Sequence, residues 1–292
     1  MVKITVIGSS SMDLVVTAQK RPDKGETILG ESFKTVPGGK GANQAVAASR
    51  LGAEVTMIGR VGDDDFGKEI IKNFSKNNVL TQCVERVTGM ESGTAHITLA
   101  DGDNSIIVVK AANDMVTAEF IEQKLEVIRE SDIVLIQQEI PEETVEFVSE
   151  TCYSLGIPLL LNPAPARPLS QKVIERATYI TPNELEAAVL FGSDDIHAAL
   201  KKYPNKVFIT EGKNGVRYHD GEKEVLISSY QVEVVDTTGA GDTFNAAFAV
   251  ALAEGKGFSD SVRFANRAAS LSVTKFGAQG GMPTREAVEG SL

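Results

Sequence analysis

Residues 236–244, with the sequence DTTGAGDTF, combine the residue types that a phosphoryl transfer needs. Gly239, Ala240 and Gly241 leave backbone N–H groups uncovered where an apolar helix is predicted to begin, and a helix N-terminus attracts anions. Asp242 follows in the first turn of that helix. Its carboxylate can cap the helix, or it can act as a general base toward a hydroxyl that attacks a phosphoryl group. The spacing therefore predicts an anion hole beside a candidate base.

A second glycine-rich stretch, PGGKGANQA at residues 37–45, also precedes a helical pattern. Its glycines allow the backbone to approach a ligand closely, and Lys40 and Asn43 offer donors to hydroxyl groups. Asp13 and Glu139 each follow a predicted strand, which places them at the edge of an α/β sheet where ligands bind. Such carboxylates and amides suit a polyhydroxyl compound. The alternatives are a plain loop-to-helix junction at 37–45 and ordinary surface or capping acids at the two carboxylates.

Two other nucleotide-binding patterns are excluded. Residues 62–69, GDDDFGKE, resemble the P-loop pattern G-x4-G-K-[ST] but end in Glu69, so the hydroxyl that would bind magnesium is missing. The three aspartates in this loop would also repel a phosphate. A nicotinamide-binding oxidoreductase is disfavoured because no G-x-G-x-x-G follows the first predicted strand.

The elements that must position these residues alternate between strands and helices. Helix-period segments such as 41–52 and 141–156 separate short apolar runs of strand length. The predicted strands are KITVIG (3–8), EVTMIG (54–59), DIVLIQ (132–137), IPLLLN (157–162), ATYITP (177–182) and KVFITEG (206–212). Strands this apolar are typical of a mostly parallel sheet covered on both faces. The predicted fold is a three-layer α/β/α core.

Two segments interrupt this alternation. Residues 14–36 lack a helical period and contain β-prone pieces around PDKG, and residues 93–110 predict a hairpin with its turn at DGDN. Both lie between core elements. We expect them to form a small β-sheet lid on a single domain that spans residues 1–292, where it would exclude water from a cleft at the strand ends. Two ordinary surface hairpins are the alternative.

The bulk composition limits the classes of partner. The chain has 292 residues, 42% of them hydrophobic, which is enough for one large core. Its formal net charge of −11 makes nucleic acid and anionic membranes poor partners. The N-terminus is a predicted core strand rather than a signal peptide, no apolar run reaches membrane-spanning length, and the two cysteines lack metal-binding spacing. We therefore expect a cytoplasmic protein with reduced cysteines.

Taken together, the motifs resemble those of a known family. PGGKGANQAVAASRLGA (37–53) with DTTGAGDTFNAAF (236–248) is similar to the paired signatures of the ribokinase family of sugar kinases. GSSSMD, VGDDDFG, QQEIP, LNPAPA, TPNELEA, ITEGKNGV, FANRAAS and FGAQGG resemble further family motifs in order and spacing, over essentially the whole chain. Within the family, GGKGANQA and LNPAPAR resemble ribose kinases more than fructokinases or adenosine kinases. The resemblance implies a ribokinase-like fold whose β-sheet lid often serves as a dimer interface.

The resemblance also implies roles for individual residues. Asp242 corresponds to the catalytic base, and the backbone of Gly239, Ala240 and Gly241 corresponds to the anion hole for the γ-phosphate. The residues that match the sugar site are Ser11, Asp13, Gly39, Lys40, Gly41, Ala42, Asn43, Glu139 and Asp242. Those that match the nucleotide site are Asn183, Thr210, Glu211, Gly212, Lys213, Asn214, Gly215, Gly241, Asp242 and Asn266.

Two cations are implied in the same way. Asn183 and Glu186 in TPNELE match an Asn-x-x-Glu element that arranges magnesium, its waters and the phosphates. The residues that match a potassium site are Asp236, Thr238, Ser272, Lys275, Gly277 and Gly281. The alternative for Asp236 is a cap of the turn before the helix that carries Asp242.

Two positions depart from the family pattern. Ser11 stands where many members have Asn, so one sugar contact is expected to be shorter or mediated by water. Gly281 stands where some members have a Ser hydroxyl on the cation, so we expect weaker potassium binding. On the sequence alone, Gly281→Ser is expected to strengthen potassium activation or leave it unchanged.

The activity implied is ATP-dependent phosphorylation of D-ribose at the 5-hydroxyl, with magnesium and with potassium as an activator. The partners implied are ribose, ATP and a second copy of the chain. A kinase of another sugar or of a nucleoside is the alternative on this scaffold, although only 6% of residues are aromatic and could stack a base. A non-catalytic sugar or nucleotide sensor is a further alternative, which the intact Asp242 and anion hole disfavour.

Overall fold

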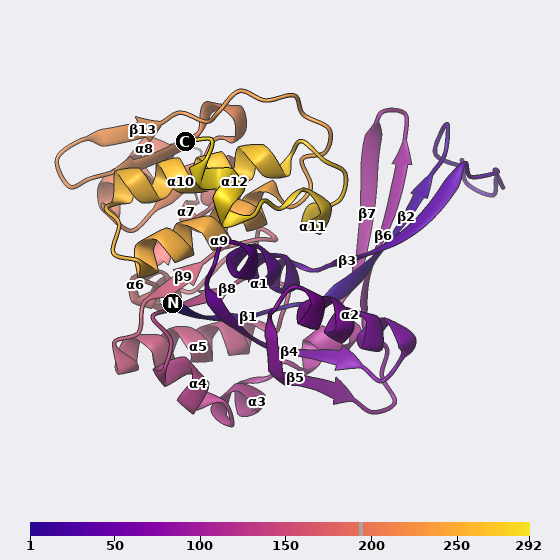
Figure 1. Cartoon of the computed structure of the whole chain (residues 1–292), viewed down its shortest axis with the longest axis horizontal. Helices are drawn as coiled ribbons and strands as arrows, with labels where there is room; N and C mark the ends of the chain where they lie inside the picture. Colours follow the sequence, from indigo (N-terminus) through magenta and orange to yellow (C-terminus); the bar gives the residue numbers. More distant parts are fainter. Residues whose placement is uncertain (193–194) are drawn as a thin grey trace.

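The computed structural model describes residues 1–192 and 195–292, and it places one large sheet between two layers of helices (Figure 1). The six strands of this sheet are parallel and lie in the order β10-β9-β8-β1-β4-β5. They span Lys3–Ile7 (β1), Glu54–Gly62 (β4), Leu80–Val87 (β5), Ile133–Ile136 (β8), Leu159–Leu161 (β9) and Tyr179–Ile180 (β10). The parallel, helix-covered sheet confirms the fold class predicted from the apolar runs.

Each face of the sheet has its own helical layer and its own core. Helices α1, α2, α9, α10 and α12 share one core with β1 and β4, while α3 to α8 pack in the other. The first layer comprises Lys40–Arg50 (α1), Asp65–Lys76 (α2), Ala240–Ala253 (α9), Phe258–Ser272 (α10) and Arg285–Glu289 (α12). The second comprises Ala118–Glu122 (α3), Leu125–Arg129 (α4), Glu142–Leu155 (α5), Gln171–Arg176 (α6), Glu184–Phe191 (α7) and Ile196–Lys202 (α8).

Three shorter helical segments complete the fold: α11 (Ala278–Gly281) and the 3-10 turns η1 (Ala111–Met115) and η2 (Gly212–Asn214). Within residues 1–192 and 195–292, no helix is both long enough and apolar enough to cross a membrane. Cys83 and Cys152 are buried and form no disulfide.

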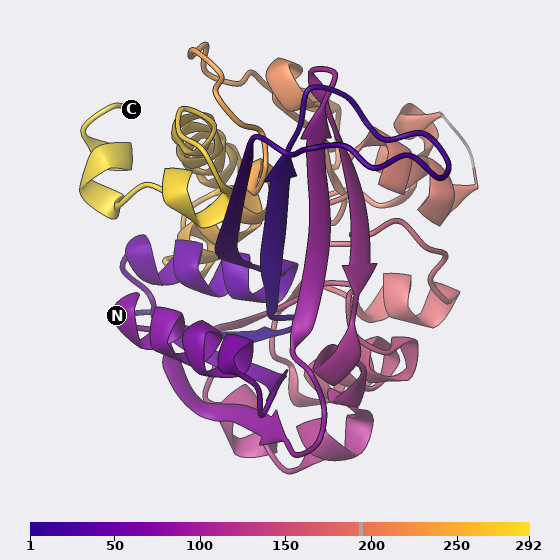
Figure 2. The same cartoon turned by 90° about the vertical axis from the view of Figure 1, so that its right-hand side faces the viewer.

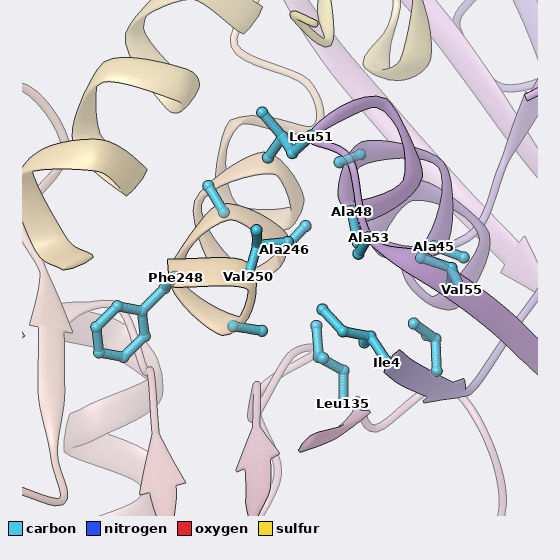
Figure 3. Close-up of a cluster of buried hydrophobic side chains, with 14 of the residues drawn as sticks. Ile4, Ala45, Ala48, Leu51, Ala53, Val55, Leu135, Ala246, Phe248 and Val250 are labelled. Carbon is cyan, nitrogen blue, oxygen red and sulfur yellow. The ribbon is translucent and has the colours of Figure 1, made fainter. Parts of the chain in front are cut away.

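Small side chains let α1 and α9 lie close together above the sheet. Ala45 and Ala48 of α1 and Ala246 of α9 are fully buried beside Ile4 and Leu135, which rise from β1 and β8 (Figure 3). Alanine costs no side-chain entropy in a helix and adds little width to the contact. The first turns of the two helices are therefore held next to each other at the edge of the sheet.

A three-stranded antiparallel sheet extends the large one. It consists of β11 (Phe208–Thr210), β12 (Val216–His219) and β13 (Glu224–Ile227). A single parallel bridge between Ile180 and Val207 joins it to β10. The strand predicted at 206–212 is therefore present, but its main partner is the antiparallel β12 rather than the parallel sheet.

A four-stranded sheet projects from the core on the right of Figure 1, and Figure 2 shows it face-on. It consists of β2 (Ser11–Thr17), β3 (Ser32–Gly38), β6 (Gly93–Ala100) and β7 (Asp103–Val109), in the order β3-β2-β6-β7. Its central pair, β2 and β6, is parallel, and Ser11 lies between Gly38 and Gly93 in one row across the sheet. The hairpin predicted at 93–110 is confirmed, and the positive φ angles of Asp101 (57°) and Gly102 (74°) fit the turn predicted at DGDN.

The false P-loop match is a helix start. Asp64 is the N-cap of α2 and accepts the backbone N–H of Gly67 at 2.7 Å. It also accepts the N–H of Ser92 at 2.8 Å, which ties α2 to the start of β6. The aspartates of this stretch therefore serve the fold, in keeping with the rejection of a phosphate loop.

Candidate active site

The centre of the large sheet brings two loops to one edge. β1 and β8 are neighbours from which the chain proceeds outward in opposite directions, and ligands of open α/β sheets bind at such a switch point. Ser9 follows β1 and Glu139 follows β8. The Ser9 hydroxyl donates to Glu139 Oε2 at 2.5 Å, so the two strand ends are directly connected.

Helix α1 begins against the same edge because glycines stand on both sides of its first residue, Lys40. The backbone N–H of Lys40 donates to Glu139 Oε2 at 3.0 Å. A Cβ on Gly41 would lie 2.7 Å from the backbone nitrogen of Ser9, and Gly39 has a φ of 89°. Only glycine allows this approach, since a side chain would force the helix away from the loop. The glycine-rich stretch at 37–45 is therefore a close backbone contact, as its composition predicted.

Asp13 is held beside Glu139 in a buried position. A Cβ on Gly38 would lie 2.2 Å from Asp13 Oδ1, so this glycine leaves room for the carboxylate. Ser11 Oγ donates to the same oxygen at 3.4 Å. Burial, reinforced by the charge of Glu139, raises the pKa of Asp13 to about 6. The ionised form of Asp13 is costly in this buried site unless it accepts hydrogen bonds. The hydroxyl groups of a bound compound could donate such bonds.

Asp242 is buried in the first turn of α9, but it does not cap that helix. Its Oδ2 accepts the side-chain amide of Asn43 at 2.9 Å, and its Oδ1 accepts that of Gln44 at 3.1 Å. Burial raises the pKa of Asp242, while Lys40 and these two amides act in the opposite direction. The carboxylate is thus fixed in place by α1 and points into the group of sugar-site candidates.

The backbone at the start of α9 offers a different set of amides to an anion than the sequence suggested. The N–H groups of Gly239, Gly241 and Asp242 have no hydrogen-bond partner within the described ranges 1–192 and 195–292. The N–H of Ala240 donates to the carbonyl of Thr237 at 3.2 Å, so it is not free. Ala240 therefore shapes the turn, and the amides left for an anion are those on either side of it.

One lysine serves four carboxylates in this site. Burial alone would lower the pKa of Lys40, but Asp242, Glu139, Glu186 and Asp13 raise it above its usual value. The site therefore keeps a positive Lys40 and carries an excess of negative charge around it. A nucleotide could enter only with counter-charges of its own, and a divalent cation would supply them.

Asn183 and Glu186 form the N-terminal capping box of α7. Asn183 Oδ1 accepts the N–H of Glu186 at 2.8 Å, and Glu186 Oε2 accepts the N–H of Asn183 at 2.8 Å. Burial raises the pKa of Glu186, and the charge of Asp242 acts in the same direction, so the capping box lies near Asp242. Within the described part of the chain, no group of three or more His, Cys, Asp or Glu side chains is arranged to hold a metal. A magnesium ion here would be held mainly by phosphates and water, which suits its preference for retained waters.

The segment Thr210 to Gly215 lies beside Asn183, with which Thr210 forms an isolated parallel bridge. Gly215 has a φ of 108°, and a Cβ there would lie 2.0 Å from the carbonyl of Ile227. The side chain of Asn266 donates to that carbonyl at 2.9 Å and to the carbonyl of Ser228 at 3.1 Å. Asn266 therefore supports the backbone of 227–228, against which Gly215 packs. Gly212, Lys213 and Asn214 are exposed, while Glu211 is buried against Arg217.

The predicted potassium residues come from two loops that Asp236 joins. Its Oδ1 accepts the N–H of Thr238 at 2.9 Å and its Oδ2 accepts the N–H of Gly277 at 2.8 Å. The carbonyls of Thr238, Ser272 and Lys275 accept no hydrogen bond from residues 1–192 and 195–292. A carboxylate and unpaired carbonyls are ligands that a large monovalent cation accepts, so the donor set fits potassium.

The structure corrects one expectation at this loop. A Cβ on Gly281 would lie 1.8 Å from the carbonyl oxygen of Ser272, which is closer than atoms can approach. A serine at 281 therefore cannot supply a hydroxyl here unless the backbone moves. The premise that a serine fits at 281 is therefore contradicted, and we expect Gly281→Ser to weaken potassium activation rather than to strengthen or preserve it.

Sequence reasoning missed the amides that surround Asp242. Gln44 Nε2 donates to Asn162 Oδ1 at 3.1 Å as well as to Asp242, and Gln137 Nε2 donates to Gln44 Oε1 at 2.7 Å. Gln279 Nε2 donates to Asn43 Oδ1 at 3.0 Å. Gln44 directly follows Asn43 and could have been suspected from that position, but nothing in the sequence indicates that Asn162 or Gln279 lies near the base.

Comparison with known proteins agrees with this geometry. The chain is 66% identical over 286 residues to the ribokinase of Bacillus subtilis (strain 168), covering 98% of each protein. It is 36% identical over 294 residues to the deoxyribokinase of Salmonella typhi, covering 97% of this chain and 96% of that protein. The solved structure of Arabidopsis thaliana ribokinase complexed with ribose and ATP matches with a TM-score of 0.92 and 35% identity, over 99% of this chain and 98% of that one. The model of the pfkB family carbohydrate kinases matches residues 1–285, and the chain therefore belongs to this family.

Proposed function

We propose that this protein transfers the γ-phosphoryl group of ATP to the 5-hydroxyl of D-ribose, giving ribose 5-phosphate and ADP. The observation that carries the proposal is the buried carboxylate of Asp242 beside the N–H groups of Gly241 and Asp242 at the start of α9, which have no hydrogen-bond partner among the described residues. A base and an anion hole on one helical turn match the two charges that change during phosphoryl transfer. The names of the similar ribokinases support ribose as the acceptor.

In the proposed reaction, Asp242 takes the proton of the sugar hydroxyl as the hydroxyl oxygen bonds to the γ-phosphorus. The bond from that phosphorus to the bridging oxygen of ADP breaks in the same displacement. The free amides of α9 stabilise the charge on the transferred group. The sugar is held by Asp13, Asn43 and Lys40, whose side chains meet at the edge of the sheet, with Gly39, Gly41 and Ala42 providing backbone.

Asn183 and Glu186 would position magnesium through its waters, and the ion would neutralise the phosphates of ATP. Thr210 to Gly215, together with the backbone that Asn266 supports, would hold the nucleotide. Potassium would lie between the loops that Asp236 joins, where it would fix the backbone of 238–241 without contacting the sugar. Its effect would therefore be on turnover or nucleotide affinity.

We further propose that the projecting sheet is a lid on a single domain and the contact surface of a homodimer. A hollow of about 660 Å³ separates its tip, residues 17–19 and 99–104, from residues 234–237, which leaves room for closure. Its edge strand β7 exposes Ile106, Ile107, Val108 and Val109 by 47–69%. An exposed apolar edge strand invites pairing with another chain, and a second copy would cover it. A kinase that draws on ATP would act in the cytoplasm.

A substrate panel tests the proposal. The purified protein is assayed for ADP release with magnesium, ATP and either D-ribose, 2-deoxyribose, fructose or adenosine. We expect the highest kcat/KM with ribose and phosphorylation at the 5-hydroxyl by NMR of the product. Because one of the similar proteins is a deoxyribokinase, 2-deoxyribose is the main alternative substrate. A higher kcat/KM with 2-deoxyribose would change the proposed substrate but not the proposed mechanism. If no ADP is released with any of the four compounds, the proposal is overturned, and the protein is a sensor or a kinase of a different acceptor.

A further inference from the structure

A chain of hydrogen-bonded amides, buried next to Asp242 and partly exposed farther away, leads from this carboxylate. Asn43 Nδ2 donates to Asp242 Oδ2 at 2.9 Å, and Asn43 Oδ1 accepts Gln279 Nε2 at 3.0 Å. Gln279 Oε1 in turn accepts Asn73 Nδ2 from helix α2 at 2.8 Å. Asn43 and Gln279 are only 6% and 7% exposed, so water does not compete strongly for these bonds.

The far end of the chain is a guanidinium group. Asn73 Oδ1 accepts Asn77 Nδ2 at 3.3 Å, and Asn77 Oδ1 accepts Arg50 Nε at 2.9 Å. Arg50 also donates to the backbone carbonyls of Gln279, at 2.6 Å, and Met282, at 3.0 Å. The segment that carries Gln279 is therefore anchored by its backbone as well as by its side chain.

The ends of this chain determine the orientation of every amide between them. Arginine can only donate, and an ionised carboxylate can only accept. With Arg50 at one end and Asp242 at the other, each of the four intervening amides must present its oxygen toward the arginine end and its NH2 group toward the carboxylate. Rotating any one of them by 180° would set two oxygens or two NH2 groups against each other, so the arrangement is internally consistent.

We infer that Gln279 is a positioning residue for the base: its NH2 group fixes the amide of Asn43, and this keeps a donor on Asp242. Without that donor, the amide of Asn43 is no longer held in one orientation, and its NH2 group is less firmly directed at the carboxylate. Asp242 would then lose a hydrogen bond to its ionised form, and a base is active only when ionised. This inference rests on the proposed role of Asp242 and assigns Gln279 no contact with substrate.

Four other charged groups also act on the ionisation of Asp242, and they must stay unchanged in the test. Lys40 of α1 favours its ionised form, whereas Glu139 after β8, Asp13 of β2 and Glu186 of α7 oppose it. A neutral substitution at 279 leaves all four in place. A change in the ionisation of Asp242 relative to the unsubstituted protein then reports on the amide chain alone.

The test is Gln279→Met, which keeps the volume and removes the donor without adding charge. We expect kcat to fall about 10-fold, the usual worth of one hydrogen bond to a charged group, with the KM for ATP nearly unchanged. The acidic limb of the kcat against pH profile should move to higher pH, because Asp242 becomes harder to ionise. Gln279→Glu, which adds a charge and makes residue 279 compete with Asp242 for the NH2 group of Asn43, should move both quantities further in the same direction. Gln123→Glu makes the same change on an exposed helix end and should leave both as they were.

The ionisation of Asp242 can also be measured without catalytic turnover. Titration of 13C-labelled aspartate by NMR, with the Asp242 signal assigned by its loss in Asp242→Asn, should show the same displacement in Gln279→Met. If Gln279→Met does not fold, Asn73→Leu is used instead, because it removes the donor that fixes the side chain of Gln279. A folded variant with unchanged kcat, pH profile and Asp242 titration would overturn the inference. Failure of the unsubstituted protein to phosphorylate any sugar would instead count against the proposed function, since the NMR titration does not depend on it.

Discussion

One carboxylate oxygen of Glu139 accepts the backbone N–H of Lys40 at 3.0 Å. The same oxygen accepts the hydroxyl of Ser9, so the end of β8, the loop after β1 and the start of α1 meet at a single atom. Three segments far apart in the sequence are thereby assembled before any sugar arrives. Such preorganisation lowers the cost of binding, because the site does not have to be built by the ligand.

Asp242→Asn should abolish most of the activity without abolishing binding. The amide has nearly the same shape as the carboxylate but cannot accept the sugar proton, so kcat should fall by about 10²–10⁴-fold. Ribose and ATP affinities, measured by calorimetry, should change little. Asp260→Asn on the exposed face of α10 is the matched control and should behave like the unsubstituted protein. Near-normal turnover of Asp242→Asn would reduce Asp242 to a structural residue.

Asp13→Asn should stabilise the fold at neutral pH. Burial raises the pKa of Asp13 to about 6 in the folded protein, whereas the unfolded chain releases this proton near the ordinary pKa of 3.8. Between these values the folded state binds more protons, so its stability falls as pH rises through this window. Asparagine does not titrate, so the variant should gain up to about 3 kcal/mol above pH 6 and nothing below pH 4. Urea unfolding at pH 4 and pH 7.5 measures the difference, and an equal gain at both would refute it.

The same position should show the opposite effect on ligand binding. Asp13→Ala removes an acceptor from ribose hydroxyls inside a buried site and should cost about 2–3 kcal/mol of ribose affinity, the upper range for bonds to a charged group. ATP affinity should be nearly unchanged. Calorimetric titration with each ligand separates the two, and a ribose affinity that survives the substitution would place the sugar elsewhere.

Gly281→Ser should weaken potassium activation. Its Cβ would meet the Ser272 carbonyl at 1.8 Å, so that carbonyl or the α11 backbone must shift away from the cation loops. Gly280→Ser is the matched control, because a Cβ there meets nothing within 4 Å. Activity is followed while potassium is added to a buffer that contains only a bulky organic cation. Asp236→Ala should abolish the response, and a protein that is fully active without potassium would remove the site.

Ile107→Lys should convert a dimer to a monomer. Ile107 is 69% exposed on the edge strand β7, and a charge there would be buried by any partner strand. Analytical ultracentrifugation gives the mass, with Tyr153→Lys as the control, since Tyr153 is equally exposed on the remote helix α5. A monomeric unsubstituted protein would contradict the proposed dimer.

The sequence predicted the parts of the fold in which local pattern and tertiary environment agree. The strands at 3–8, 54–59 and 132–137 are apolar runs, and both of their faces are buried. β5 was missed because LTQCVERV is a half-exposed strand with charged and polar residues on its open side. β12 and β13 were missed for the same reason, since each is too short and too polar to stand out from a loop.

The site was predicted where a backbone feature accompanies it. Glycines before a helix indicate a close approach, and this placed the residues around Lys40 and Asp242 correctly. The partners of Asp242 could not be found in this way. Asn162 and Gln279 are ordinary amides in ordinary stretches, and their meeting near one carboxylate depends on how α1, α9 and α11 pack. The closed space at Gly281 is likewise a property of the folded loop, because it arises from contact with a carbonyl nine residues away.

The chain passes between the core and the projecting sheet at four points that lie in one line. Gly38, Ser11 and Gly93 share a row of the sheet, and Lys110 directly follows Val109, the last residue of β7, next to that row. Asn113 binds the backbone of Ser10 and the carbonyl of Lys110, so it holds two of these crossings together. A rigid sheet that is connected to the core along one line can move in only one way, by rotation about that line. Closure of the sheet over a sugar would then cost little conformational entropy. A substitution at any of the four connections would change the angle of the whole sheet relative to the core rather than the shape of one strand.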